Sequence, residues 1–176
     1  MNALSPAEKA ELLDALLTAR PELRGQAEEL ATRRLSKVDS TGVVDAVESA
    51  LRSAEIDELD GRAGHRPGIG YLHPVDAAAE ILDELLRPFL DDLQRHARLG
   101  MTAATTEVAV GILHGLHRCR DGGLGSLLEY SPDSADERAA QVVWQCRALA
   151  VDLPVDDLVD ALPSWEPLFG HGWSTR

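Results

Sequence analysis

Apolar residues recur at helical spacing along most of this sequence. Leu12, Leu13, Leu16 and Leu17 follow one another at intervals that place all four on one side of a helix. Comparable stripes follow, separated by proline or glycine. Runs of β-branched and aromatic residues, which strands favour, are missing, and aromatic residues make up only 4% of the chain. The sequence therefore predicts an all-α fold.

Start and stop signals divide the chain into about seven helices. Two segments open with the Ser-x-x-Glu pattern of a capping box, at Ser5 to Glu8 and at Ser134 to Glu137. Ser40 or Thr41 is expected to cap the third helix, and Pro88 to kink or split the longest one. The expected ranges are about 6–20, 21–36, 40–54, 74–99, 102–120, 134–149 and 154–162.

Short connections between most of these helices make neighbours antiparallel. The expected architecture is a single domain over 1–176, with helical hairpins stacked as an irregular α–α superhelix. A closed helical bundle is the alternative. Residues 60–73, rich in glycine and proline, are expected to form a long loop, anchored to the core by Tyr71 and Leu72. The tail at 163–176, with Trp165, Phe169 and Trp173, is expected to pack onto the body.

The charge balance limits the partners. Seventeen basic side chains face thirty acidic ones, a net charge of −13. Such a surface repels phosphate backbones and anionic lipid, so the sequence predicts no nucleic-acid binding and no membrane association. The first residues lack the pattern of a signal peptide, and two cysteines are too few for a disulfide framework. We expect a cytoplasmic protein.

One cluster has metal-ligand character. His114 and His117 are three apart on an expected helix and share a face, whereas Cys119 is turned away from it. A further ligand would have to come from Cys146 or His171. The favoured interpretation is that the histidines are partly exposed and Cys119 is a small buried apolar residue. We therefore predict no metal and no cofactor, and keep His114 and His117 as the candidates.

Other chemical groupings are weaker. The segment at 64–70 resembles a phosphate-binding loop only in its glycines, since it lacks the Gly-Lys-Ser/Thr ending, although His65 and Arg66 could contact an anionic ligand. Paired acids at 28–29, 91–92 and 156–157 point about 100° apart on a helix and do not converge. No nucleophile signature is present, so we predict that the chain is not an enzyme.

Gly111 and Gly115 indicate close helix packing. Four residues apart on an otherwise apolar helix, they leave a smooth groove that a second helix can approach. We expect this groove to be filled by ordinary packing within the fold.

Several segments together are similar to an uncharacterised bacterial helical-repeat family, of the type found beside SWIM zinc-finger domains. They are 16–23 (LLTARPEL), Tyr71, the Leu99–Gly100 turn and 106–116 (TEVAVGILHGL). The resemblance covers roughly 10–130 and implies a superhelix of the HEAT or tetratricopeptide type that serves as an interaction module. It supplies no catalytic residues, and the zinc-finger ligands have no counterpart here.

The expected function is accordingly a non-enzymatic protein–protein interaction module. Its binding surface would be the concave face or the loop at 60–73, where His65, Arg66 and Tyr71 are the candidate contacts. The partner would be another protein or a second copy of the chain. The alternative is a small-molecule or metal-binding helical domain that uses the 60–73 loop with His114 and His117.

Overall fold

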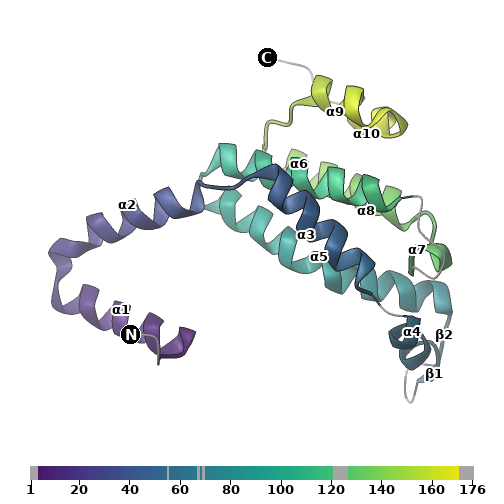
Figure 1. Cartoon of the computed structure of the whole chain (residues 1–176), viewed down its shortest axis with the longest axis horizontal. Helices are drawn as coiled ribbons and strands as arrows, with labels where there is room; N and C mark the ends of the chain where they lie inside the picture. The colour runs from purple at the N-terminus through teal and green to yellow at the C-terminus, as the bar shows by residue number, and fades with distance from the viewer. Residues whose placement is uncertain (1–3, 55, 67, 69, 121–126, 171–176) are drawn as a thin grey trace. The chain divides into compact units, whose positions relative to one another are not determined.

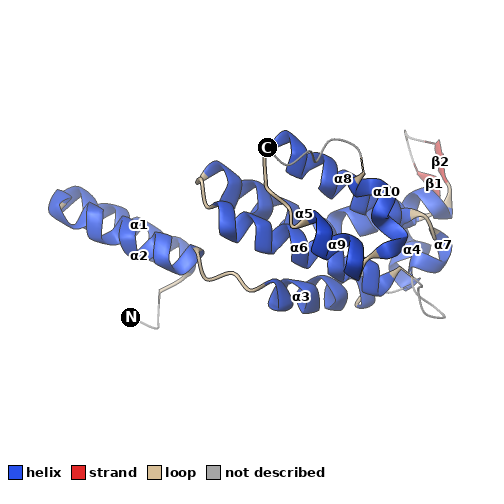
Figure 2. Cartoon of the chain, turned by 90° about the horizontal axis from the view of Figure 1, so that it is seen from above, coloured by secondary structure: helices blue, strands red, loops and turns tan. Residues whose placement is uncertain are grey.

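The computed structural model describes residues 4–54, 56–66, 68, 70–120 and 127–170 (Figures 1 and 2). Helices account for nearly all of its regular structure, and one short two-stranded sheet is the exception. The all-α prediction is confirmed. Where the sequence predicts one domain over 1–176, the backbone contacts divide the chain into two compact units, 1–37 and 38–176. Each unit is described separately below.

The N-terminal unit is a pair of helices joined by a short 3-10 turn. Helix α1 spans Pro6–Ala19, the turn η1 spans Pro21–Leu23 and helix α2 spans Arg24–Leu35. The predicted capping box is present, because the Ser5 N–H donates to Glu8 Oε2 at 2.8 Å and the Glu8 N–H donates to Ser5 Oγ at 3.3 Å. Hydrogen bonding to the Ser5 backbone N–H, and then to the Ser5 side chain, lowers the pKa of the Glu8 carboxyl. Proline at position 21 ends the first helix, as expected.

The larger unit contains the remaining elements. Their bounds are α3 Ser40–Arg52, α4 Ile56–Arg62, β1 Gly64–Arg66, β2 Gly70–Leu72, α5 Pro74–Arg98, α6 Thr102–Cys119, α7 Leu127–Tyr130, α8 Ser134–Ala148, α9 Val155–Ala161, η2 Pro163–Trp165 and α10 Glu166–Phe169. Helix α5 continues through Pro88, so the predicted split does not occur. Within the described part of the chain, no helix is both long and apolar enough to cross a membrane.

Helix α6 is the centre of the larger unit. It packs against α3, α5 and α8, and Figure 1 shows α3 lying along α5 and α6. The strongest partner of α6 is thus α3, which is distant in sequence, an arrangement closer to the bundle alternative than to a row of sequential hairpins. The inner face of α6 predicted from the sequence is buried: Val108, Ala109, Ile112, Leu113 and Leu116.

Two glycines of α6 permit this close approach. A Cβ atom added to Gly111 would lie 2.5 Å from Val43 Cβ and 2.9 Å from the Ser40 carbonyl oxygen. One added to Gly115 would lie 2.7 Å from Val47 Cβ. Atoms at such distances overlap, so only glycine fits at these positions while α3 stays where it is. The groove predicted from the glycine spacing exists, and α3 fills it.

The predicted loop at 60–73 is wrong for most of its length. Helix α4 extends to Arg62, and strands β1 and β2 then form an antiparallel hairpin in which His65 pairs with Tyr71. Glycines at 64, 68 and 70 adopt positive φ angles, which suits the twisted backbone of a hairpin. Leu72 packs against the core as expected, but Tyr71 is 67% exposed and does not anchor the segment.

Both remaining cap predictions are also corrected. Asp39 caps α3, in place of Ser40 or Thr41, and its carboxylate accepts the Thr41 N–H at 3.2 Å. The capping box predicted at Ser134 does not form, because the N-cap of α8 is Asp133. The Ser134 hydroxyl instead lies 2.5 Å from the Ser131 hydroxyl and is buried with it.

Trp165 and Phe169 in the aromatic tail are buried, which confirms that this part of the tail packs onto the body. The Trp165 indole N–H donates to Asp136 Oδ1 on α8 at 2.7 Å. A buried indole needs such a partner, and Arg120 in turn holds Asp136 at 3.0 Å. Trp173 lies outside the described residues.

Candidate functional site

The N-terminal unit is rich in leucine, yet its described side chains are not buried. Eight leucines lie between residues 4 and 35, yet none of the residues described in this unit is buried. Four of the eight leucines are about half exposed: Leu12 at 52%, Leu13 at 50%, Leu16 at 47% and Leu30 at 56%. The stripe that the sequence predicted is present on α1, and three of its four leucines, Leu12, Leu13 and Leu16, are exposed.

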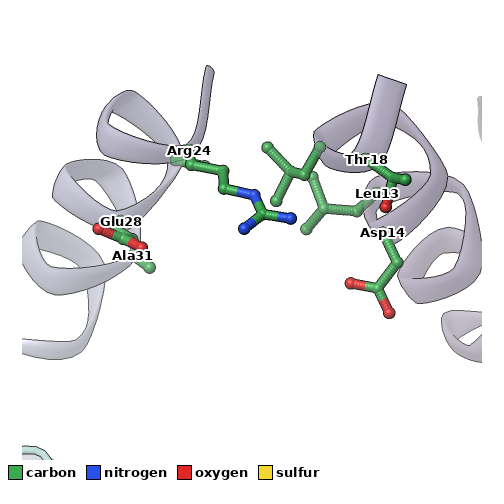
Figure 3. Close-up of a pocket in the computed structure, with 8 residues that line it drawn as sticks. Leu13, Asp14, Thr18, Arg24, Glu28 and Ala31 are labelled. Atoms are coloured by element: carbon green, nitrogen blue, oxygen red, sulfur yellow. The ribbon is translucent and has the colours of Figure 1, made fainter. Parts of the chain in front are cut away.

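A groove runs between α1 and α2 within this unit (Figure 3). Its volume is about 580 Å³, within the size range of ordinary binding clefts. The α1 wall carries Leu13, Asp14, Leu17 and Thr18, and the α2 wall carries Arg24, Ala27, Glu28 and Ala31. One wall therefore has large apolar side chains, whereas the other has small ones. Sequence reasoning missed this groove, because periodicity does not give the angle between two helices.

Arg24 is the most distinctive polar group of the groove. Figure 3 shows its guanidinium reaching from α2 into the space between the helices, towards the wall that holds Asp14. No carboxylate among the described residues lies within ion-pair distance of it. A guanidinium carries five N–H donors and matches a carboxylate well. The groove thus offers a free cation beside an apolar wall.

The unit also differs from the rest of the chain in charge. Residues 1–37 contain six basic and six acidic side chains, so this segment is neutral. The whole net charge of −13 therefore belongs to residues 38–176. Copies of the acidic body repel one another, whereas contacts through the neutral segment carry no such penalty.

The residues proposed for the loop surface lie on the hairpin. His65 and Tyr71 are both exposed and form a cross-strand pair, and Arg66 belongs to β1 opposite Gly70. The Tyr71 ring meets the His73 ring edge-on, with their centroids 6.4 Å apart. The hairpin brings His65 and Tyr71 together on the surface, and their role in binding stays a prediction.

His114, His117 and Cys119, the candidate metal-binding cluster, have different surroundings in the structure. His117 Nε2 lies 3.1 Å from Ser164 Oγ, and its ring meets Trp165 edge-on at 5.1 Å. Burial, and then electrostatic interaction with His117 and Arg118, lowers the pKa of His114. Across the described residues, no three side chains of metal-ligand type converge. His171, one possible further ligand, lies outside them.

The two cysteines are buried thiols of the larger unit. Burial raises the pKa of Cys119, and it raises the pKa of Cys146 to about 12. A thiol with a raised pKa is a poor nucleophile and a poor metal ligand, because both roles need the thiolate. Cys119 therefore matches the interpretation of a small buried apolar residue.

Ser164 and His117 together have the spacing of a nucleophile and its base. A working pair also needs a group that orients the imidazole and donors that stabilise an oxyanion. Among the described residues, the other partner of the His117 ring is Trp165, whose indole N–H is taken by Asp136. The hydrogen bond instead ties the 3-10 turn η2 to the end of α6.

Comparisons of the chain with protein-family models, with curated proteins and with solved structures find no match in any of the three. The resemblance to the helical-repeat family therefore stays a prediction. Function has to be argued from the surfaces described above.

Proposed function

We propose that this chain is a non-enzymatic protein–protein interaction module that binds its partner through the groove between α1 and α2. The observation that carries this proposal is the N-terminal unit itself, in which there are eight leucines and none of the described residues is buried. Helix pairs of this size do not bury enough surface to be stable alone. The unit therefore gains stability when a partner covers its apolar side chains.

The composition of the surface fits a helical partner. Helix-in-groove recognition places an apolar stripe with spacing i, i+3, i+4 and i+7 against leucine and alanine side chains. Leu13 and Leu17 form such a wall on α1, and Ala27 and Ala31 leave room for an incoming helix on α2. The chemistry of the groove is mainly packing, with Arg24 available to select an acidic group.

A pull-down with matched baits tests this proposal. The full chain, the double variant Leu13→Glu/Leu17→Glu and the control Ala15→Glu are immobilised and exposed to a lysate of the source cells. Ala15 is exposed and lies about 200° around the helix from Leu13, so Ala15→Glu adds a glutamate to α1 away from the leucine wall. We expect the same polypeptide to be retained by wild type and control and lost with the double variant. Equal retention by all three baits, or by none, contradicts the proposal.

The hairpin is tested in the same assay as a second surface. Exposed tyrosine is common at binding hot spots, and Tyr71 has the exposure for that role. If β1 and β2 form the binding surface, Tyr71→Ala removes the retained polypeptide and Leu13→Glu/Leu17→Glu does not. That result would move the binding site to the hairpin.

The metal-binding alternative is supported by no observation as strong as the groove between α1 and α2. It requires His114 and His117 to share an ion, and His117 Nε2 is already at hydrogen-bond distance from Ser164. We therefore propose the interaction module alone.

A further inference from the structure

The groove between α1 and α2 is complementary to the helices that form it. The leucine-rich α1 matches the small side chains Ala27 and Ala31 of an α2 wall, and the α2 wall matches the leucines of an α1. The helices have similar lengths, 14 and 12 residues. We propose that a second copy of the chain occupies the groove, so that residues 6–35 of two copies form a four-helix bundle. This inference rests on the proposed function.

A two-fold axis makes the contact reciprocal. In a symmetric dimer the same patch is used by both copies, so each α1 enters the groove of the other copy. Leu13 and Leu17 then pack against the partner helices, and Leu12 and Leu16 on the adjoining side of α1 become the next layer. Four-helix bundles bury apolar layers of this kind at positions three and four residues apart.

Charge complementarity favours this occupant. The α1 helix carries Glu8, Glu11 and Asp14 against a single Lys9, whereas α2 carries Arg24, Arg33 and Arg34 against two glutamates. Packing α1 of one copy on α2 of the other brings opposite charges together. It also supplies carboxylates within reach of Arg24, which has none within ion-pair distance among the residues that the structure describes in one copy.

The distribution of net charge points to the same contact. Two bodies that each carry the full −13 charge repel, and the neutral N-terminal segment is the part of the chain least affected by this repulsion. A foreign acidic helix would meet Arg24 equally well, but the leucine wall that fits the alanine wall is already present in this chain. A second copy therefore satisfies the packing and the charge requirement together.

Sedimentation velocity of the purified full chain tests the inference, over about 1 to 100 µM at physiological salt, the range in which modest protein interfaces dissociate. We expect a species of twice the 19.0 kDa chain mass. Leu13→Glu/Leu17→Glu is expected to raise the dissociation constant at least about a hundredfold, since two charges per copy enter an apolar layer. Ala15→Glu should leave the dimer unchanged.

Tryptophan fluorescence controls for unfolding of the variants. All three tryptophans belong to residues 38–176, so a native emission spectrum shows that the body of each variant is folded. A further variant, Arg24→Glu, should weaken the dimer by a smaller factor, and more at low salt than at high salt, because it removes the charge match and keeps the leucines.

Three results would overturn the inference. A wild-type chain that stays monomeric over the whole range excludes the second copy as occupant, while the pull-down still decides whether the groove binds another protein. A dimer that survives Leu13→Glu/Leu17→Glu places the contact elsewhere on the chain. A dimer lost equally in Ala15→Glu shows that added charge, and not the leucine wall, is the cause.

Discussion

Leucine fills the interior of the larger unit, whereas in the N-terminal unit it remains in contact with solvent. On α6, Ile112 and Leu113 are fully buried, and Gly111 lets α3 approach until no Cβ would fit. On α1, Leu12 and Leu13 have the same helical spacing but are about half exposed. A helical stripe of leucine therefore indicates a surface that needs covering, and it does not say whether the same chain covers it.

Charge separates the two regions in the same way. The larger unit holds the entire net charge of the chain yet excludes it from a core of buried apolar residues. The N-terminal unit is neutral, and none of its residues from 4 to 37 is buried. The larger unit thus has an apolar core of its own beneath a repulsive charge, whereas the neutral unit carries the proposed binding surface. The following predictions measure that contrast.

The largest expected contrast is in thiol reactivity. Burial raises the pKa of Cys146 from 9.0 to about 12, so at near-neutral pH its thiolate fraction is about a thousandfold lower than that of an exposed cysteine. A thiol-reactive dye should therefore modify the native wild-type chain very slowly. The variant Ala15→Cys has an added thiol on the exposed side of α1, and this thiol should react rapidly with one equivalent of dye per chain. Rapid modification of both native cysteines would show that the core of the larger unit opens readily.

The second contrast is between two leucines shortened in the same way. Leu113→Ala removes a fully buried side chain and should cost about 2–5 kcal/mol of unfolding free energy. Leu12→Ala, on α1, should change it by less than about 0.5 kcal/mol, as at other exposed sites. Urea unfolding monitored by tryptophan fluorescence reports on the larger unit alone and measures both. Similar losses for the two variants would mean that α1 contributes to the same core.

Local signals explain what could be predicted from the sequence. The capping box at Ser5, the glycine groove on α6 and most helix ranges depend on residues close together in the chain, and all were found correctly. The hairpin at 64–72 was missed because glycines that permit positive φ were interpreted as a loop. The cap predicted at Ser134 failed because Asp133 occupies the N-cap position, and the Ser134 hydroxyl lies against that of Ser131, three residues before it.

The candidate site depended on information that the sequence does not carry. His65 is exposed, but Tyr71, which was expected to anchor the loop to the core, is exposed as well. The groove between α1 and α2 depends on the angle that η1 sets between the helices. Likewise, the contacts of His117 with Ser164 and Trp165 join residues more than forty positions apart in sequence.

The third contrast compares the replacement of glycine by alanine at two positions. Gly111→Ala places a Cβ within 2.5 Å of Val43 Cβ, so α3 must move away from α6, at a cost of about 1–3 kcal/mol. Gly42→Ala, on the facing helix α3, meets nothing within 4 Å and should stabilise the helix by up to about 1 kcal/mol. The two variants should thus shift the urea midpoint in opposite directions. A gain for Gly111→Ala would show that the helices are not in close contact there.

The smallest expected effect concerns the ends of two helices in the larger unit. Helix α5 ends with Gly100 at φ 69°, and the Met101 N–H donates to the His96 carbonyl oxygen at 3.0 Å. Helix α8 ends in the same motif with Ala150 at φ 52°, and the Val151 N–H donates to the Cys146 carbonyl oxygen at 2.8 Å. Ala150 therefore occupies a left-handed conformation that disfavours residues with a Cβ.

Exchanging these two residue types should move stability in opposite directions. Ala150→Gly relieves the left-handed strain and should stabilise the larger unit by about 0.5–1 kcal/mol. Gly100→Ala introduces the same strain where a Cβ meets nothing within 4 Å, so its cost, of similar size, is conformational alone. Thermal unfolding of both variants gives the comparison. A loss of stability in Ala150→Gly would show that the flexibility glycine adds to the unfolded chain outweighs the strain at this helix end.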